Sequence, residues 1–125
     1  MTNVTATAAI EREAEFAAEP DRVWRALTDP AELARWWCQA ASFELRAGAD
    51  GWMEWTEHGR FAIRIEAVEP GSRFAWRGAR DRDTALEAGP TTTVEFTLSP
   101  GARGGTLLTI REEGFVRDEI GRAHV

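Results

Sequence analysis

The side chains that could do covalent or metal chemistry in this chain are few and scattered. Cys38 is the single cysteine, and the two histidines, His58 and His124, are distant from it in sequence. A thiol needs an adjacent base to become a strong nucleophile, so we interpret Cys38 as a small buried hydrophobic residue. The same scatter predicts no metal site. The sequence has no phosphate-binding loop, nucleophile elbow or dinucleotide fingerprint, which predicts that the protein uses no cofactor.

Glu112 is the carboxylate that strand alternation turns toward an apolar face. Side chains two residues apart in a strand share a face, and Glu112 continues the series of Leu108 and Ile110. An inward carboxylate can act as a general base or accept a hydrogen bond from a ligand. It can also pair with a neighbouring arginine, and the sequence favours this second interpretation because structural ion pairs are common at such positions. The inward face of the last two strands is expected to carry Val94, Phe96, Leu98, Leu108 and Ile110.

Tryptophans supply the second chemical feature, an aromatic surface. Trp36 and Trp37 are adjacent at the expected end of a short helix, where neighbouring side chains point about 100° apart. We expect one of them to pack inward and the other to border the entrance of a cavity. Trp76 shares a strand face with Phe74 and is therefore expected to point inward, with core packing as its favoured role.

Two short helices are predicted over residues 20–37 to position these side chains. Pro20 suits the first position of a helix, because the N–H that proline lacks has no helical partner there. Pro30 ends this helix, since the residue before a proline avoids the helical region, and Asp29 then caps the next helix. Helices this short are marginal in isolation and need a larger apolar surface to pack on.

The rest of the chain is predicted to form strands joined by turns. Alternation over 10–18 predicts a half-buried strand with Ile10 and Phe16 on the inner face. Glycine- and proline-rich turns separate six further strands, expected at 42–46, 52–57, 61–68, 73–77, 91–98 and 106–113. Connections of hairpin length predict an antiparallel meander.

The register of strand 52–57 stays open at this point, because each alternative contains a tryptophan. Either Trp52 and Glu54 or Met53 and Trp55 face the interior.

Charged residues dominate two further segments. Arg64 and Glu66 face outward from strand 61–68 and predict a cross-strand charge ladder worth only about a few tenths of a kcal/mol. The irregular segment 78–90 is interpreted as a solvated charged loop rather than a functional lid.

Length and composition bound the class of protein. A chain of 125 residues with 43% hydrophobic and 29% charged residues is typical of one folded domain. The net charge is −6, and every cation is an arginine interleaved with acids, so nucleic acid is not an expected partner. One cysteine, no targeting segment and no apolar stretch of membrane-spanning length predict a cytoplasmic protein without a membrane partner.

The order of elements predicts an α+β fold in which helices cover one face of a curved sheet. A long amphipathic helix is expected after the last strand, yet residues 116–125 allow only about two to three helical turns. We therefore expect a single domain over 1–125, with 1–8 frayed and 116–125 as the remnant of a C-terminal helix. If the chain ends at Val125, the apolar face lacks its cover, and we expect a homodimer or a swapped assembly.

Three stretches of the sequence resemble a known family. They are VWRALTDPAELARWW at 23–37, RFAIRIEAVEPGSRFAWRG at 60–78 and GGTLLTIREEGF at 104–115. In this order they resemble the bacterial homologues of the activator of Hsp90 ATPase (AHSA-type), within the START-like (SRPBCC, polyketide cyclase-like) superfamily. The resemblance implies a helix-grip fold, in which a curved antiparallel sheet of about six to seven strands wraps around a long C-terminal helix, with two short helices at one edge. In this chain the C-terminal helix is expected to be truncated.

The resemblance also implies a function, because members of the family bind apolar or amphipathic small molecules. We expect such a molecule in a cavity between the curved sheet and the helices. Two alternatives stay open: an enzyme of the cyclase or hydrolase type that uses the inward carboxylate, and a co-chaperone-like interaction module. No catalytic residue is assigned. The residues expected to line the ligand site are Trp36, Trp37, Met53, Trp55, Trp76, Phe96, Ile110 and Glu112.

Overall fold

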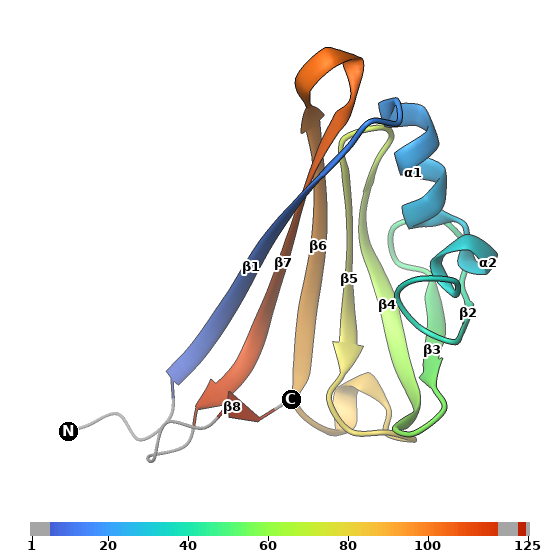
Figure 1. Cartoon of the computed structure of the whole chain (residues 1–125). Helices are drawn as coiled ribbons and strands as arrows, with labels where there is room; N and C mark the ends of the chain where they lie inside the picture. The colour runs from blue at the N-terminus through green and yellow to red at the C-terminus, as the bar shows by residue number, and fades with distance from the viewer. Residues whose placement is uncertain (1–5, 118–122, 125) are drawn as a thin grey trace.

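The structure, a computed structural model, describes residues 6–117 and 123–124. The two α-helices follow the first strand, and the remaining strands come after them along the chain (Figure 1). The elements in chain order are β1 (Ala6–Phe16), α1 (Pro20–Thr28), α2 (Pro30–Leu33), β2 (Ala40–Ser42), β3 (Asp50–Trp55), β4 (Gly59–Glu69), β5 (Arg73–Ala79), the 3-10 helix η1 (Leu86–Ala88), β6 (Thr91–Pro100), the 3-10 helix η2 (Ala102–Gly104), β7 (Thr106–Arg117) and β8 (Ala123–His124).

Seven strands form one antiparallel sheet in the order β1-β7-β6-β5-β4-β3-β2, and β8 pairs with the end of β7. From β2 to β7 each strand lies beside its successor in the sequence, which confirms the predicted meander. Strand β1 pairs with β7, so β1 and β2 form the two edges of this sheet.

Both helices begin at the predicted prolines, and the first ends at Thr28, just before Asp29 and Pro30. The main-chain N–H of Asp29 donates to the carbonyl of Arg25 over 3.1 Å, and its carboxylate accepts from the N–H of Ala31 over 2.9 Å. The second helix is shorter than expected and ends at Leu33. Trp36 and Trp37 therefore lie in the turn after α2, because both of their N–H groups bend back to the carbonyl of Leu33 before the chain enters β2.

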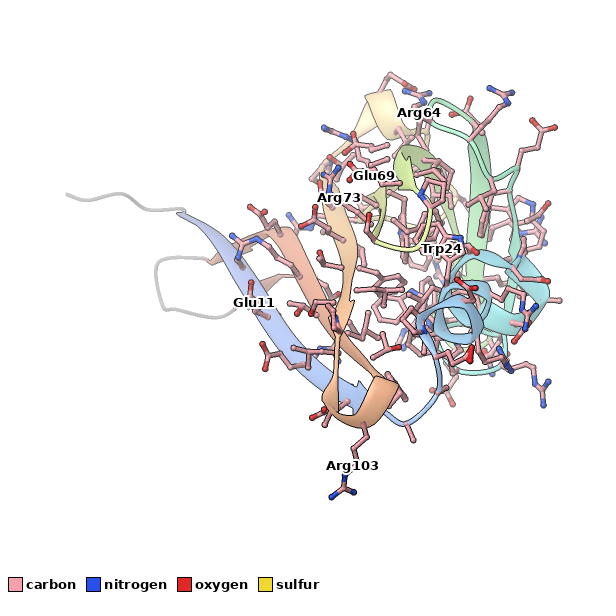
Figure 2. The ribbon with its side chains drawn as sticks, turned by 90° about the horizontal axis from the view of Figure 1, so that it is seen from above. Glu11, Trp24, Arg64, Glu69, Arg73 and Arg103 are labelled. Carbon is pink, nitrogen blue, oxygen red and sulfur yellow. The ribbon has the colours of Figure 1, made fainter. Side chains whose placement is uncertain are left out.

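The core lies between the concave face of the sheet and the two helices. The inward residues predicted for β6 and β7 are all buried, and Phe96 stands opposite Ile110 in the register. Trp24 of α1 reaches Phe74 of β5 with ring centroids 6.4 Å apart. Figure 2 looks down on the curved sheet and shows Glu11 on the edge strand β1, apart from the helices.

Strand β1 is more exposed than the sequence predicts. Ile10 and Phe16 are 42% and 41% exposed, so the expectation of a half-buried strand is wrong. The cause is position: β1 is an edge strand bonded to β7 alone, while α1 packs against β6 and α2 against β2. Over residues 6–117 and 123–124, no helix covers this part of the inner face.

The strand expected over 42–46 is also corrected, because β2 covers Ala40–Ser42. Residues 43–49 reverse the chain before β3 begins, and at their end Gly48 and Ala49 form main-chain hydrogen bonds with Ile65 of β4. Phe43 turns inward instead and packs on Phe74, with ring centroids 5.8 Å apart.

Both expectations for the chain ends are wrong where the structure describes them. The predicted helical remnant is a strand at Val116 and Arg117, which pair with β8. The predicted fraying fails for residues 6–8, which pair with 115–117 as part of β1. Paired strands satisfy more main-chain groups than a helix of a few residues could. Residues 1–5, 118–122 and 125 lie outside the described residues.

The outer face carries the predicted charge ladder. Arg64 pairs with Asp50 over 2.7 Å and with Glu87 over 3.0 Å, and Arg77 pairs with Glu66 over 2.9 Å. Hydrogen bonds from Arg64 to Asp50 and Glu87 raise the pKa of its guanidinium. Such exposed pairs add little stability. The stability of the fold therefore depends on the apolar side chains packed on the inner face of the sheet.

Candidate functional site

A cavity of about 480 Å³ lies against the concave face of the sheet. Strands β3 to β7 and the turn after α2 all contribute to its walls. Most of the lining side chains are apolar, and the aromatic ones are Trp37, Trp55, Phe61 and Trp76. The volume falls within the range of about 300–1,000 Å³ that is usual for sites that bind small molecules.

The aromatic walls are locked together by edge-to-face contacts. The rings of Trp37 and Trp76 have centroids 5.8 Å apart at 86°, and those of Trp55 and Phe61 lie 5.7 Å apart at 75°. Such pairs gain stability beyond the area that they bury. These ring contacts therefore hold the aromatic walls of the cavity in place.

The register of β3 is decided by this packing. Met53 is fully buried and lines the cavity together with Trp55. Trp52 points to the opposite face, where the guanidinium of Arg60 lies 3.7 Å from its ring centroid. Of the two registers that the sequence leaves open, the structure therefore has Met53 and Trp55 inward.

Trp37 is held at the cavity by its main chain. Its N–H donates to the carbonyl of Leu33 over 2.9 Å, and its carbonyl accepts from the indole Nε1 of Trp55 over 3.0 Å. Trp55 thus joins β3 to the turn after α2, and the ring of Trp37 packs directly on Trp76 and Phe96 of the sheet.

Glu112 lines the cavity, and its carboxylate pairs with a guanidinium. The Nη2 of Arg12 lies 2.5 Å from Oε2 of Glu112, whose side chain is 19% exposed. The interpretation of Glu112 as an inward residue paired with an arginine is confirmed. The pair joins neighbouring strands β1 and β7.

Three polar residues of the wall were missed by the sequence reasoning: His58, Arg80 and Thr92. His58 lies in the turn between β3 and β4, where its N–H donates to the carbonyl of Trp55 over 3.0 Å. Strand alternation could have found the other two, because Thr92 precedes Val94 by two residues and Arg80 follows Trp76 by four. Nothing local to the sequence places His58 at this wall.

The expected site residues divide into three groups. Trp37, Met53, Trp55, Trp76 and Glu112 line the cavity. Their part in ligand binding stays a prediction.

The other three expected residues lie outside the cavity wall. Phe96 and Ile110 are buried in the core, and the ring of Phe96 lies 5.2 Å from that of Trp76. Trp36 is 44% exposed and lines a separate outer hollow of about 510 Å³. This hollow shares Trp37, Trp55 and His58 with the cavity.

Cys38 is buried, as its interpretation as a small hydrophobic residue predicts. Burial raises the pKa of its thiol, an effect that a main-chain hydrogen bond from Ala40 partly offsets. Within the described part of the chain, no three His, Cys, Asp or Glu side chains gather as they would around a metal ion.

The sequence model of the family described as "Activator of Hsp90 ATPase homolog 1-like protein" matches residues 17–124. The chain belongs to this family. Membership confirms the resemblance drawn from the three sequence stretches, and the curved antiparallel sheet with its two helices confirms the helix-grip α+β fold. The fold of Hsp90 ATPase activator homologues supports ligand binding in general, but it does not identify the ligand. No match to the chain is found among the curated proteins.

Solved structures share this fold. DynU16, a protein of the dynemicin biosynthetic locus, is 29% identical with a TM-score of 0.70 over 85% of this chain, which spans 37% of DynU16. MLL2253 from Mesorhizobium loti is 25% identical with a TM-score of 0.71, over 88% of this chain and 77% of that one. The Aha1 dimer from Colwellia psychrerythraea is 18% identical with a TM-score of 0.68, over 86% of this chain and 76% of that one. At that identity the Aha1 likeness shows the fold alone.

Among the helices that the structure describes, none has the length and apolar character needed to cross a membrane.

Proposed function

We propose that this Hsp90 ATPase activator homologue binds an apolar or amphipathic small molecule in the cavity on the concave face of its sheet. The observation that carries the proposal is the cavity itself: about 480 Å³, walled by four aromatic side chains and rimmed by a few polar ones. Sites for small molecules have this composition, since apolar walls supply affinity and a few polar groups fix orientation.

Glu112 has the role of a ligand anchor or rim residue in this proposal. Its carboxylate already pairs with Arg12, and this pairing favours a structural or anchoring role over that of a general base. A reaction of the cyclase or hydrolase type has no specific support from the residues around the cavity.

Gly78 offers a way to test the cavity directly. It follows Trp76 by two residues on the inner face of β5, and a Cβ at this position would meet its nearest neighbour, Cγ2 of Ile63, at 3.6 Å. That is ordinary contact for a Cβ, and because Gly78 lines the cavity we expect the rest of a leucine side chain to enter it. Gly78→Leu should therefore fill the space without removing any wall residue.

The experiment is a thermal-shift screen of hydrophobic fluorophores and lipids on the wild type and two variants. We expect at least one compound to raise the melting temperature of the wild type and to have no effect on Gly78→Leu. Thr97→Leu is the matched control, because Thr97 is exposed on the outer face of β6, and it should respond like the wild type. The absence of any stabilising compound at high micromolar concentration would contradict the proposal.

We also propose that the chain forms a homodimer through the uncovered part of its inner face. Ile10 and Phe16 are exposed there, and exposed apolar patches are typical of interaction sites. The similar structure from Colwellia psychrerythraea is that of a dimer, and a second copy of this chain is the partner that we propose. The oligomeric state in solution tests this proposal.

A further inference from the structure

Strand β1 has one edge without a partner strand. It is bonded to β7 along residues 6–16 and has no second neighbour among the strands that the structure describes (Figure 1). Such an edge presents main-chain N–H and C=O groups that can pair with a strand of another chain. Strand β1 has 11 residues, and at the usual rise of a strand its free edge is about 36 Å long.

The exposed apolar side chains of β1 are placed symmetrically about position 13. Ile10 and Phe16 lie at equal distances before and after Glu13 in the sequence, and they are the exposed large hydrophobic residues of this strand. When two identical strands pair antiparallel, residues face each other if their numbers have a constant sum. A two-fold axis at Glu13 therefore places Ile10 of each copy opposite Phe16 of the other.

We propose that the homodimer forms by antiparallel pairing of β1 with β1 of a second copy, with Glu13 on the two-fold axis, so that the two sheets join into one. This inference rests on the proposed homodimer. The Ile10 and Phe16 side chains meet on the inner face, which no helix covers at β1 over residues 6–117 and 123–124. Cross-strand pairs of an aromatic and a β-branched side chain stabilise a sheet.

Another register of the same two strands is longer but fits the side chains less well. With Glu11 on the axis, the whole of β1 could pair. That register places Ile10 opposite Arg12 and leaves Phe16 without a large apolar partner. Because the register of a strand follows its apolar pattern, the register centred on position 13 is favoured.

Three carboxylates on the outer face oppose this pairing, and they differ in their own partners. In the proposed register Glu11 faces Glu15 of the second copy, and Glu13 faces its own counterpart. Glu11 already pairs with Arg111 over 3.2 Å, and Glu15 accepts the N–H of Ala102 over 2.9 Å. Glu13 has no such partner among the described residues. Since like charges directly opposite each other are destabilising, the two Glu13 carboxylates weaken the dimer that the inner face favours.

Cysteine cross-linking tests the register. Glu13→Cys and Glu11→Cys each put a thiol on the outer face of β1, so they form a matched pair. In the proposed register the two thiols of Glu13→Cys lie opposite each other, with Cα atoms about 4.5–5.5 Å apart, and a disulfide can join them. The thiols of Glu11→Cys are displaced by about 13 Å along the strands, which is too far for a disulfide.

The variants and the wild type are oxidised mildly in dilute solution. We expect about ten-fold more cross-linked dimer from Glu13→Cys than from Glu11→Cys, and none from the wild type, whose single cysteine is buried. Equal cross-linking of the two variants, or more in Glu11→Cys, would overturn the inference. If neither cross-links while light scattering shows a dimer, this inference fails and the proposed homodimer stands. If all three proteins are monomeric, both fail.

A second measurement needs no cross-link. Glu13→Gln removes the charges that face each other at the axis, so sedimentation equilibrium should show the dissociation constant of the dimer falling by about three-fold. Glu57→Gln is the control, because it removes the same charge from the exposed turn between β3 and β4 and should leave that constant unchanged. An equal effect of the two variants, or no effect of either, would overturn the inference.

Discussion

Trp55 donates its indole N–H to the main-chain carbonyl of Trp37 over 3.0 Å, and this single bond joins β3 to the turn after α2. The two residues are neighbours on the cavity wall. The bond therefore sets where the helical segment meets the sheet, and with it the shape of the cavity.

Replacing Trp55 by phenylalanine should weaken both the fold and the cavity wall. The variant Trp55→Phe leaves the carbonyl of Trp37 without this donor, and we expect the free energy of unfolding to fall by about 1–3 kcal/mol. Urea denaturation measures it. Trp52→Phe is the control on the same strand, since Trp52 lies on the outer face over Arg60, and it should lose no more than about 0.5–1 kcal/mol. Equal losses in the two variants would show that the bond to Trp37 contributes nothing.

The arrangement of elements was largely predictable, because its signals are local. Pro20 and Pro30 mark the starts of the two helices, and the carboxylate of Asp29 caps the second as expected. Glycine-rich turns separate the strands from β3 to β7 near the predicted positions. Each of these features depends only on a few residues that are neighbours in the sequence, so it can be predicted from the sequence alone.

Long-range placement was predicted less well. The register of β3 depends on whether Met53 or Trp52 points to the buried inner face of the sheet, and both side chains are apolar. His58 reaches the cavity wall only because β3 ends there. The exposure of Ile10 follows from its place on β1, an edge strand bonded to β7 alone. None of these facts has a local signal in the sequence.

The ion pair between Arg12 and Glu112 should contribute modestly. Arg12 is largely exposed, so we expect Glu112→Gln to lower the free energy of unfolding by no more than about 1 kcal/mol at low salt. Arg12→Gln should cost a similar amount, and the double variant should cost less than the sum of the two. A double-mutant cycle by chemical denaturation measures this coupling. Strictly additive losses would show that the two side chains do not stabilise each other.

The thiol of Cys38 gives a pH dependence with a definite sign. Burial raises its pKa above the ordinary value of 9.0, so the folded protein holds the thiol proton more tightly than the unfolded chain does. This contribution to stability is complete below pH 9.0 and is lost as the pH rises from there through the raised pKa. The sequence has no tyrosine and no lysine, so few other side chains titrate in that range.

Urea denaturation of the wild type and Cys38→Ala at pH 7.5 and pH 10 checks this prediction. The wild type should lose stability between the two pH values, and the alanine variant should lose less. The same loss in both proteins would show that the thiol is not its source.

The uncovered inner face should control the oligomeric state. We expect wild-type protein to be a dimer by light scattering, and the double variant with Ile10→Ser and Phe16→Ser to shift toward monomer, because it removes the exposed apolar side chains. Glu13→Ser, on the opposite face of β1, is the control and should stay dimeric. A wild-type protein that is monomeric at every concentration would contradict the proposed homodimer.

The cavity is the centre of this account, and one titration tests it most directly. The neutral fluorophore N-phenyl-1-naphthylamine is titrated into the wild type, Gly78→Leu and Thr97→Leu, and its emission is followed to saturation. We expect saturable binding with one site per chain in the wild type and in Thr97→Leu, and none in Gly78→Leu, whose added side chain occupies the cavity. Equal binding by Gly78→Leu, or no saturable binding by the wild type, would contradict the account.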